Sequence, residues 1–530
     1  MPLESENSII SITHRKILLT AGATFLGAGA ILAGCLVYLP KNGSHSGSGA
    51  GNAARAGASE QAMTNNFLSL AGDSLLNMHE QAGDGWRFKS AIQAPHYQTD
   101  RDVGAASVGM GFLVMADQDP KDGKWLQAAE KTADWLTAVA QTDGKGGTYW
   151  TDYVDGNQKS ADVYTSFDDG AIGIGDFYWQ LYAKTHDQQY KNIALSSLQW
   201  TFAQAQNIGT TAVPAYSWPW EPADAGSPHY MGMGEGAAGL VYSFAGYYQR
   251  LKDSDPALAA QCRQYIDGTL RYMSQARTAL GNNNGDARAL PETGIIGRDG
   301  DTTMNSGYLS GAAGAAFMYL KLYQVFHDQQ YLTDANSIFS WLQDTRSGPM
   351  VTLPDGSVAW KLSLDPQGGD DPELATGFEE GAAGIGWTYL QAYKITGDQQ
   401  YLSIAKKAAN WLSDVSVKSV SGITWHEDES PTNPIIHTNL NNGAAGIGMF
   451  LSDLAGVTGD AKYQNMAQQA LNWITAAAQH DGSNIYWNDN DGENNYSRDP
   501  SWHWGTAGII AFTARMAGGS VDIPGEEPGL

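Results

Sequence analysis

The sequence has little cysteine and little basic charge, and both shortages exclude classes of function. Cys35 and Cys262 are the only cysteines among 530 residues, too few for a disulfide framework or a thiolate-rich metal site. Lys and Arg number 31 against 56 Asp and Glu, so the net charge is −25 and nucleic acid is not an expected partner. The sequence also lacks a phosphate-binding glycine loop and a Gly-x-Ser-x-Gly nucleophile motif.

Glycine is abundant, by contrast, and recurs as one signature that opens seven apolar segments. The copies begin at Gly104 (GAASVG), Gly170 (GAIGIG), Gly236 (GAAG), Gly311 (GAAGAA), Gly381 (GAAGIG), Gly443 (GAAGIG) and Gly505 (GTAGII). Their first glycines are 62 to 75 residues apart. Such regular self-similarity indicates a repeat architecture, and we expect one repeat-built domain over residues 60–518.

The fifth repeat predicts how each unit folds. Residues 381–396 read as a helix whose first turn is small, Gly397 ends it, and Asp398 caps a second helix over residues 399–415. In that second helix Tyr401 and Trp411 stand ten residues apart, which is helical spacing. Each repeat is therefore predicted to be a helix hairpin.

Seven such hairpins predict an all-α fold, an (α/α)7 toroid of the six- and seven-hairpin glycosidase-like architecture. The glycine-rich helices would form its inner layer and the Tyr/Trp helices its outer layer. The last repeat ends near Met516, too early for an outer helix, so residues 61–80 are expected to supply it and clasp the ring. Aromatic connections after the outer helices predict short β-hairpins or loops at one rim.

The N-terminal residues are expected to lie outside this fold. Residues 1–16 would be cytoplasmic, and the uncharged 23-residue stretch 17–39 exceeds the roughly 20 residues that span a bilayer. An uncleaved anchor, a lipoprotein with Cys35 lipidated and a cleaved signal all remain open. Each would place the globular body outside the cytoplasm at the cell membrane. Residues 40–59 read as a Gly/Ser/Ala linker and residues 519–530 as a flexible tail.

The two residues before each starting glycine should face the mouth of the ring. In order they are Asp102-Val103, Asp168-Asp169, Gly234-Glu235, Leu309-Ser310, Glu379-Glu380, Asn441-Asn442 and His503-Trp504. Acids at helix N-termini are also favoured by capping and by the helix dipole, so each acid alone has a structural explanation. Two adjacent acid pairs on opposite sides of a ring are explained less well in that way.

The seven glycine-opened helices in an all-helical ring resemble the lanthionine synthetase C-like (LanC-like) family over about residues 60–516. That resemblance implies an α/α toroid and, for the peptide cyclases of the family, a zinc ion held by Cys-x-Gly and Cys-His-Gly motifs. This chain has Glu379-Glu380-Gly381 and Asn441-Asn442-Gly443 at the matching places. Zinc in such a site needs thiolate or imidazole ligands, so we predict no metal and no cofactor. Cys262 fills an outer-helix slot and is expected to be a buried structural residue.

Acids with tryptophans nearby are typical of sugar binding, because aromatic faces stack on sugar rings and acids and amides bind hydroxyls. Hydrolysis of a glycosidic bond needs two carboxylates, one protonated and one ionised. The catalytic candidates are Asp168, Asp169, Glu235, Glu379 and Glu380. The ligand-binding candidates are Asp102, Trp218, Trp220, Trp425, Asn441, Asn442, Trp487, His503 and Trp504.

Three functions remain open at this point. The first is a zinc-free LanC-like protein that acts on an extracytoplasmic glycan, like a glycoside hydrolase. The second is a non-catalytic module that binds a glycan or peptide, and the third is a LanC-like enzyme that modifies peptides. In all three the membrane is contacted through the N-terminal segment alone.

Overall fold

The computed structural model describes residues 49–91, 96–155, 158–294, 302–428, 435–490 and 495–519. The chain divides into two units, residues 1–61 and 62–530. The predicted membrane segment 17–39, the start of the linker and residues 520–530 lie outside the described residues. Helix α1 (Gly49–Leu76) reaches back into the range predicted as a flexible linker, where alanine favours helix. None of the helices that the structure describes is long and apolar enough to cross a membrane.

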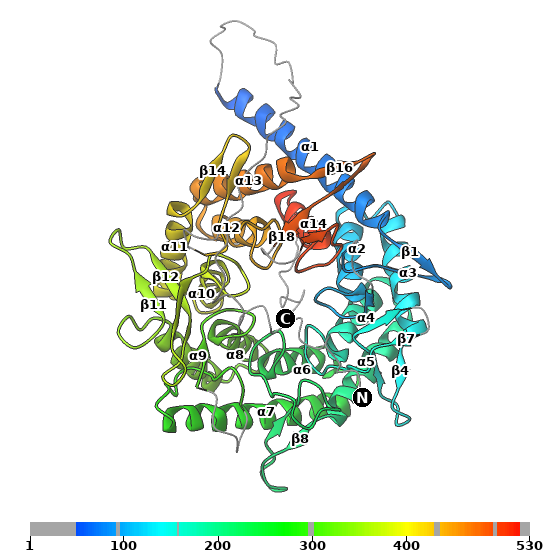
Figure 1. Cartoon of the computed structure of the whole chain (residues 1–530), viewed down its shortest axis with the longest axis vertical. Coiled ribbons are helices and arrows are strands. Elements are labelled where there is room, and N and C mark those ends of the chain that lie inside the picture. The colour runs from blue at the N-terminus through cyan, green and yellow to red at the C-terminus, as the bar shows by residue number, and fades with distance from the viewer. Residues whose placement is uncertain are drawn as a thin grey trace, which may run out of the picture. The chain divides into compact units, whose positions relative to one another are not determined.

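Two layers of helices form the ring of residues 62–530, and Figure 1 shows the inner layer surrounded by the outer one. The inner helices are α2 (Ala105–Gln118), α4 (Ala171–Thr185), α6 (Ala237–Leu251), α8 (Ala312–Phe326), α10 (Ala382–Thr396), α12 (Ala444–Thr458) and α14 (Thr506–Met516). The outer helices are α1, α3 (Lys124–Val139), α5 (Gln188–Ala203), α7 (Pro256–Asn282), α9 (Gln329–Leu342), α11 (Gln399–Asp414) and α13 (Ala461–Ala477). The predicted all-α toroid of seven hairpins is confirmed.

The glycine signature is required by close backbone approach at the start of each inner helix. We count positions from the first glycine of each motif as 0. In six repeats position +3 is glycine, and a Cβ there would lie about 2 Å from the carbonyl oxygen of position −3, as for Gly173 on Phe167 (1.8 Å) and Gly384 on Phe378 (1.9 Å). The chain therefore folds over its own helix at distances that no side chain tolerates. Repeat one is the exception, because Ser107 stands at +3.

The helix ends follow the predicted chemistry. Gly397 ends α10 in the left-handed region at φ 74°, and the side chain of Asp398 accepts the Gln400 N–H at the start of α11. His186 and His327 adopt the same left-handed conformation at the ends of α4 and α8. Cys262 is buried within α7, as expected.

Short antiparallel hairpins follow six of the outer helices. They are β1 (Glu80–Ala82) with β2 (Gly85–Arg87), β4 (Gln141–Thr142) with β5 (Thr148–Tyr149), β8 (Gln206–Asn207) with β9 (Tyr216–Ser217), β11 (Met350–Thr352) with β12 (Val358–Leu364), β14 (Val417–Ser419) with β15 (Gly422–Thr424), and β16 (Gln479–Asp481) with β17 (Asn484–Tyr486). The remaining strands are β3 (Tyr97–Gln98), β6 (Tyr153–Asp155) and β7 (Gln158–Lys159) in one sheet, β10 (Met304–Asn305) and β13 (Asp371–Leu374) beside β12, and β18 (Asn488–Asn490) with β19 (Asn495–Ser497). The predicted hairpins after the outer helices are confirmed.

The N-terminal helix supplies the missing outer helix, as the repeat count predicts. Phe67 of α1 makes an edge contact with Trp487, with ring centroids 5.9 Å apart. Ser74 Oγ accepts the Ile485 N–H at 2.8 Å. Residues from the two ends of the ring therefore lie side by side and close it.

Candidate functional site

The mouth of the ring is built by a circle of backbone hydrogen bonds. At five junctions between neighbouring repeats, the carbonyl of position −2 accepts the N–H groups of positions −3 and −2 of the repeat before it. The accepting residues are Gly234, Leu309, Glu379, Asn441 and His503, and a single bond from Arg101 N–H to the Asp168 carbonyl continues the circle into repeat one. This hydrogen bonding fixes the −2 residues of repeats two to seven at the same level around the axis.

Helix capping does not account for the acids at the mouth. The capping residue stands at −4, where Asp100 Oδ1 accepts the N–H groups of Val103 and Gly104 at 2.7 and 2.9 Å. Ser166, Asn439 and Ser501 accept the equivalent N–H in their own repeats. The first glycine of every inner helix has no side-chain cap of its own. The acids at −2 and −1 are therefore available for other contacts.

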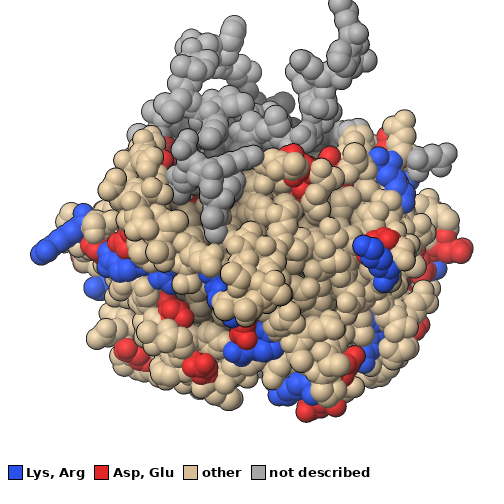
Figure 2. Space-filling model, turned by 90° about the horizontal axis from the view of Figure 1, so that it is seen from below, with Lys and Arg blue, Asp and Glu red and all other residues tan. Residues whose placement is uncertain are grey.

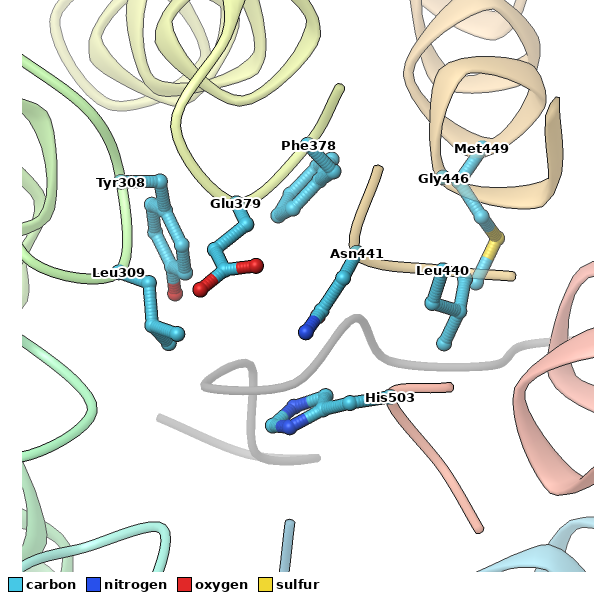
Figure 3. Close-up of a pocket in the computed structure, with 9 residues that line it drawn as sticks. All are labelled: Tyr308, Leu309, Phe378, Glu379, Leu440, Asn441, Gly446, Met449 and His503. Carbon is cyan, nitrogen blue, oxygen red and sulfur yellow. The ribbon is translucent and has the colours of Figure 1, made fainter. Parts of the chain in front are cut away.

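A small cavity lies on the axis between repeats four and seven. Its volume is about 20 Å³, enough for roughly one water molecule or one ligand group. It is lined by Tyr308, Leu309, Phe378, Glu379, Leu440, Asn441, Gly446, Met449 and His503. Figure 3 shows the Glu379 carboxylate, the Asn441 amide and the His503 ring pointing toward the same space. This volume is far below the roughly 300 to 1,000 Å³ of a pocket that encloses a whole small molecule, so the three convergent polar groups suit one group of a ligand.

His503 is held by Asp102 from the opposite end of the chain. The Nδ1 atom of His503 lies 2.6 Å from Asp102 Oδ1, and the His503 side chain is 3% exposed. Burial opposes the charged ring, but the Asp102 hydrogen bond and the charge of Asp168 outweigh it, so the pKa of His503 is raised. Both residues are ligand-binding candidates from the sequence, and the structure brings them into direct contact although they are 401 positions apart.

Asp168 is the most deeply buried of the predicted catalytic acids. Its Oδ1 lies 3.7 Å from Arg101 Nη1, and Arg101 also lies 3.8 Å from Asp176 Oδ2 on α4. Burial raises the pKa of Asp168, while His503 and Arg101 oppose that rise. Among the described residues Asp168 Oδ2 has no hydrogen-bond partner. A Cβ added at Gly234 would lie 2.4 Å from Asp168 Oδ2, so the neighbouring repeat approaches this carboxyl group closely.

Asp169 and Glu235 form the second acidic group of the mouth. Asp169 Oδ2 accepts the Trp220 indole N–H at 3.2 Å and a hydrogen bond from Ser166 Oγ at 3.3 Å. Burial and the neighbouring Glu235 raise the pKa of Asp169 well above its usual value. Trp220 in turn stacks on Tyr164, with ring centroids 4.4 Å apart. The structure thus combines an acid whose pKa is raised, a second carboxyl group and the Trp220–Tyr164 pair, whose rings are buried.

Other predicted site residues are engaged with neighbouring repeats. Glu380 Oε1 accepts the Ser310 hydroxyl at 2.6 Å and the Ser310 N–H at 3.1 Å. Asn442 donates its amide to Glu427 Oε1 at 3.1 Å. Trp504 makes an edge contact with the buried His437, at 6.5 Å between ring centroids. These contacts bind adjacent repeats together at the rim.

The expectation that Trp218, Trp425 and Trp487 present a face to a ligand is not met. They are 5%, 1% and 4% exposed, and each donates its indole N–H to a carbonyl in the last turn of the preceding outer helix. Trp150 and Trp360 make the same contact. The physical reason is that the last carbonyls of a helix lack partners within it, and a buried indole satisfies one of them.

The residues at the family's zinc positions do not fit a thiolate zinc site. Glu379 and Asn441 stand where the motifs carry cysteine, Asn442 stands where they carry histidine, and Cys262 is buried in α7. In the part of the chain that the structure describes, no group of three or more His, Cys, Asp or Glu side chains is arranged to hold a metal ion.

Three residues near the mouth were missed by the sequence reasoning. Arg101 stands at −3, where the other repeats carry apolar or aromatic residues, and this difference could have identified it as a site residue from the sequence. Glu427 and His437, whose Oε2 and Nε2 lie 3.6 Å apart, stand 16 and 6 residues before Gly443 and carry no comparable signal. Figure 2 adds that acidic and basic side chains are interspersed on the face it shows, rather than gathered in one basic patch.

The sequence comparisons point to one family. The profile described as "Lanthionine synthetase C-like protein" matches residues 160–522. A Danio rerio protein named glutathione S-transferase LANCL1 is 25% identical over 228 residues, 42% of this chain and 43% of that protein. An Arabidopsis thaliana protein named LanC-like protein GCL1 is 23% identical over 192 residues, 36% and 34% of the two chains. The chain thus spans less than half the length of either curated relative.

The structural comparison agrees at the level of the fold. Nisin cyclase superimposes with a TM-score of 0.51 and 12% identity, covering 79% of this chain and 88% of that one.

Proposed function

This chain belongs to the lanthionine synthetase C-like family, and we propose that it acts on a carbohydrate bound at the mouth of its ring, with Asp169 as proton donor and Glu235 as ionised partner. The observation that carries this proposal is the placement of Asp169, which is held by the Trp220 N–H and the Ser166 hydroxyl and neighbours Glu235; burial and Glu235 raise its pKa. A carboxyl group whose pKa is raised by a neighbouring carboxyl group is suited to the proton-donor role in glycosidic hydrolysis.

The chemistry divides between these two groups. Asp169 gives its proton to the oxygen that leaves the glycosidic carbon as the C–O bond breaks. Glu235 stabilises the positive charge that develops on the sugar ring or takes a proton from the attacking water. The Trp220 N–H and Ser166 hydroxyl orient Asp169. The amide of Asn441 points into the axial cavity, where it offers hydrogen bonds to sugar hydroxyls.

The test is turnover of an oligosaccharide panel by the full chain, with released reducing ends measured by mass spectrometry. Asp169→Asn and Glu235→Gln should each reduce the rate about 10²- to 10⁴-fold, because each removes one proton-transferring group. Asp253→Asn is the matched control, since Asp253 is exposed between α6 and α7. Turnover that survives both mouth variants at the control rate would contradict the proposal.

A non-catalytic binding module is the second candidate, favoured by the small axial cavity and by the engagement of Glu380 with Ser310. Binding of a glycan without turnover, unchanged by Asp169→Asn, would favour it. A peptide ligand is a further alternative, because two similar proteins are named glutathione S-transferase LANCL1 and nisin cyclase. A thiol-containing peptide therefore belongs in the same panel, and its modification would favour the third function.

A further inference from the structure

The contact between Asp102 and His503 lies at a unique point of the ring. Six junctions between repeats are joined at the mouth by backbone hydrogen bonds. Among the described residues, no backbone hydrogen bond joins repeats seven and one at this level. Two side-chain contacts replace it, His503 Nδ1 with Asp102 Oδ1 at 2.6 Å and the Trp502 N–H with Ser107 Oγ at 3.3 Å. We call this seventh junction the seam.

Only one of the two seam contacts also belongs to the axial cavity. His503 lines the cavity beside Glu379 and Asn441, as Figure 3 shows, whereas Ser107 and Trp502 are absent from its lining. With Nδ1 engaged by Asp102, Nε2 is the remaining hydrogen-bonding atom of the His503 ring. A carboxylate on Nδ1 selects the tautomer with hydrogen on Nδ1, so Nε2 of the neutral ring accepts a hydrogen bond.

We infer that His503 contacts the ligand through Nε2 and that Asp102 is its positioning residue, so that one of the two contacts at the seam also orders the site. The inference rests on the proposed function and adds to it a subsite for one hydroxyl group of the carbohydrate. That hydroxyl would donate to His503 Nε2 and lie between Glu379 and Asn441. The cavity volume of about 20 Å³ admits one group of that size.

A purely structural role would predict something different. If the Asp102–His503 contact only closed the ring, then removing it should act like removing the Ser107–Trp502 contact. Both contacts join the same two repeats through a single side-chain hydrogen bond. Ser107→Ala is therefore the matched control for Asp102→Asn, because it weakens the seam without altering the cavity lining.

The experiment compares His503→Gln, Asp102→Asn and Ser107→Ala in the full chain, using the oligosaccharide that the wild type turns over. We expect His503→Gln to raise KM about tenfold or more, because one ligand hydrogen bond is lost. Asp102→Asn should raise KM and move the acidic limb of the pH profile of kcat/KM to lower pH, since the ring loses its carboxylate partner. Ser107→Ala should keep the wild-type KM and pH profile.

A second readout needs no substrate. Nitrogen NMR signals of the His503 ring, assigned by their loss in His503→Gln, report its tautomer and titration in the free protein. We expect Nδ1 to carry hydrogen in the wild type and the titration to move to lower pH in Asp102→Asn, with Ser107→Ala unchanged.

These readouts separate failure of the inference from failure of the proposed function. Turnover with unchanged KM and pH profile in both His503→Gln and Asp102→Asn would overturn the inference and leave the function standing. If the wild type turns over no glycan, the proposed function fails and the NMR signals decide the positioning role. If the His503 ring then shows the same tautomer and titration in the wild type and in Asp102→Asn, the positioning role of Asp102 is overturned. A titration shifted to lower pH in Asp102→Asn would support that role for a different hydroxylated ligand.

Discussion

Neighbouring repeats are joined at the mouth by backbone hydrogen bonds at six junctions and by side-chain contacts at the seam. At a backbone junction the −3 carbonyl lies so close to position +3 that glycine is required there. The junction is then formed by backbone groups, without the side chains of the mouth. At the seam Ser107 replaces that glycine and its hydroxyl accepts the Trp502 N–H. The seam therefore depends on side-chain identity where the junctions depend on the absence of a side chain. The one irregular motif, GAAS, marks the place where the ring closes.

The largest effect is expected from a side chain added at a backbone junction. Gly384→Ala would place a Cβ 1.9 Å from the Phe378 carbonyl oxygen, so the segment before α10 must move and its hydrogen bonds to the Asn441 carbonyl are lost. We expect a loss of about 3 kcal/mol or more in unfolding free energy, measured by urea denaturation.

The matched control for that variant is Gly456→Ala in α12. A Cβ at Gly456 meets nothing within 4 Å, so this change should stabilise the protein by roughly 0.5 to 1 kcal/mol. Equal destabilisation by both variants would show that close approach is not what the +3 glycine provides.

The tryptophans give the next largest effect. Trp425→Phe removes the indole N–H that Leu412 O accepts at 2.6 Å and leaves a small cavity. We expect a loss of about 2 kcal/mol in stability with unchanged KM for the glycan. Trp220→Phe should show the opposite balance, with a smaller stability loss and slower turnover, because Trp220 donates to Asp169. A raised KM in Trp425→Phe would restore the ligand-binding role to that residue.

The tryptophans also show where sequence reasoning reaches its limit. The period and helix ends were predictable because each depends on residues close in the chain, such as Gly397 and Asp398. The −2 positions were predictable because the repeat places them equivalently. The contact made by Trp425 was not predictable, because the local sequence around an aromatic residue after a turn does not distinguish one that binds a sugar from one that donates to a helix carbonyl. Contacts between repeats, such as Ser310 with Glu380, leave no local signal at all.

A smaller effect is expected from restoring the regular motif at the seam. Ser107→Gly completes the glycine pattern in repeat one but removes the acceptor for the Trp502 N–H. We expect a loss of about 1 kcal/mol, detected as faster amide hydrogen exchange at the starts of α2 and α14. The junction between α10 and α12 serves as the internal control. Unchanged exchange at the seam would mean that the serine contact contributes nothing to closure.

The smallest expected effect is a pH dependence confined to the seam. The pKa of His503 is raised in the folded protein, so its stabilisation is fully present below the unfolded value near 6.5 and is lost as pH rises through the folded pKa. The charged groups that face this ring are Asp102, Asp168 and Arg101, with Glu379 lining the same cavity.

The backbone groups that form the other junctions do not titrate near pH 6.5. Amide exchange at the seam can therefore be compared with exchange at a backbone junction in the same sample. Exchange at the seam, corrected for its intrinsic pH dependence, should accelerate above pH 6.5 by an amount that corresponds to about 0.5 kcal/mol. Exchange at the junction of α10 and α12 should stay constant. Asp102→Asn should abolish or reverse this acceleration, because burial, which lowers the pKa of His503, then acts without the Asp102 hydrogen bond that opposes it. A parallel rise at both places would mean that the whole ring loosens with pH and that its side-chain junction has no special sensitivity.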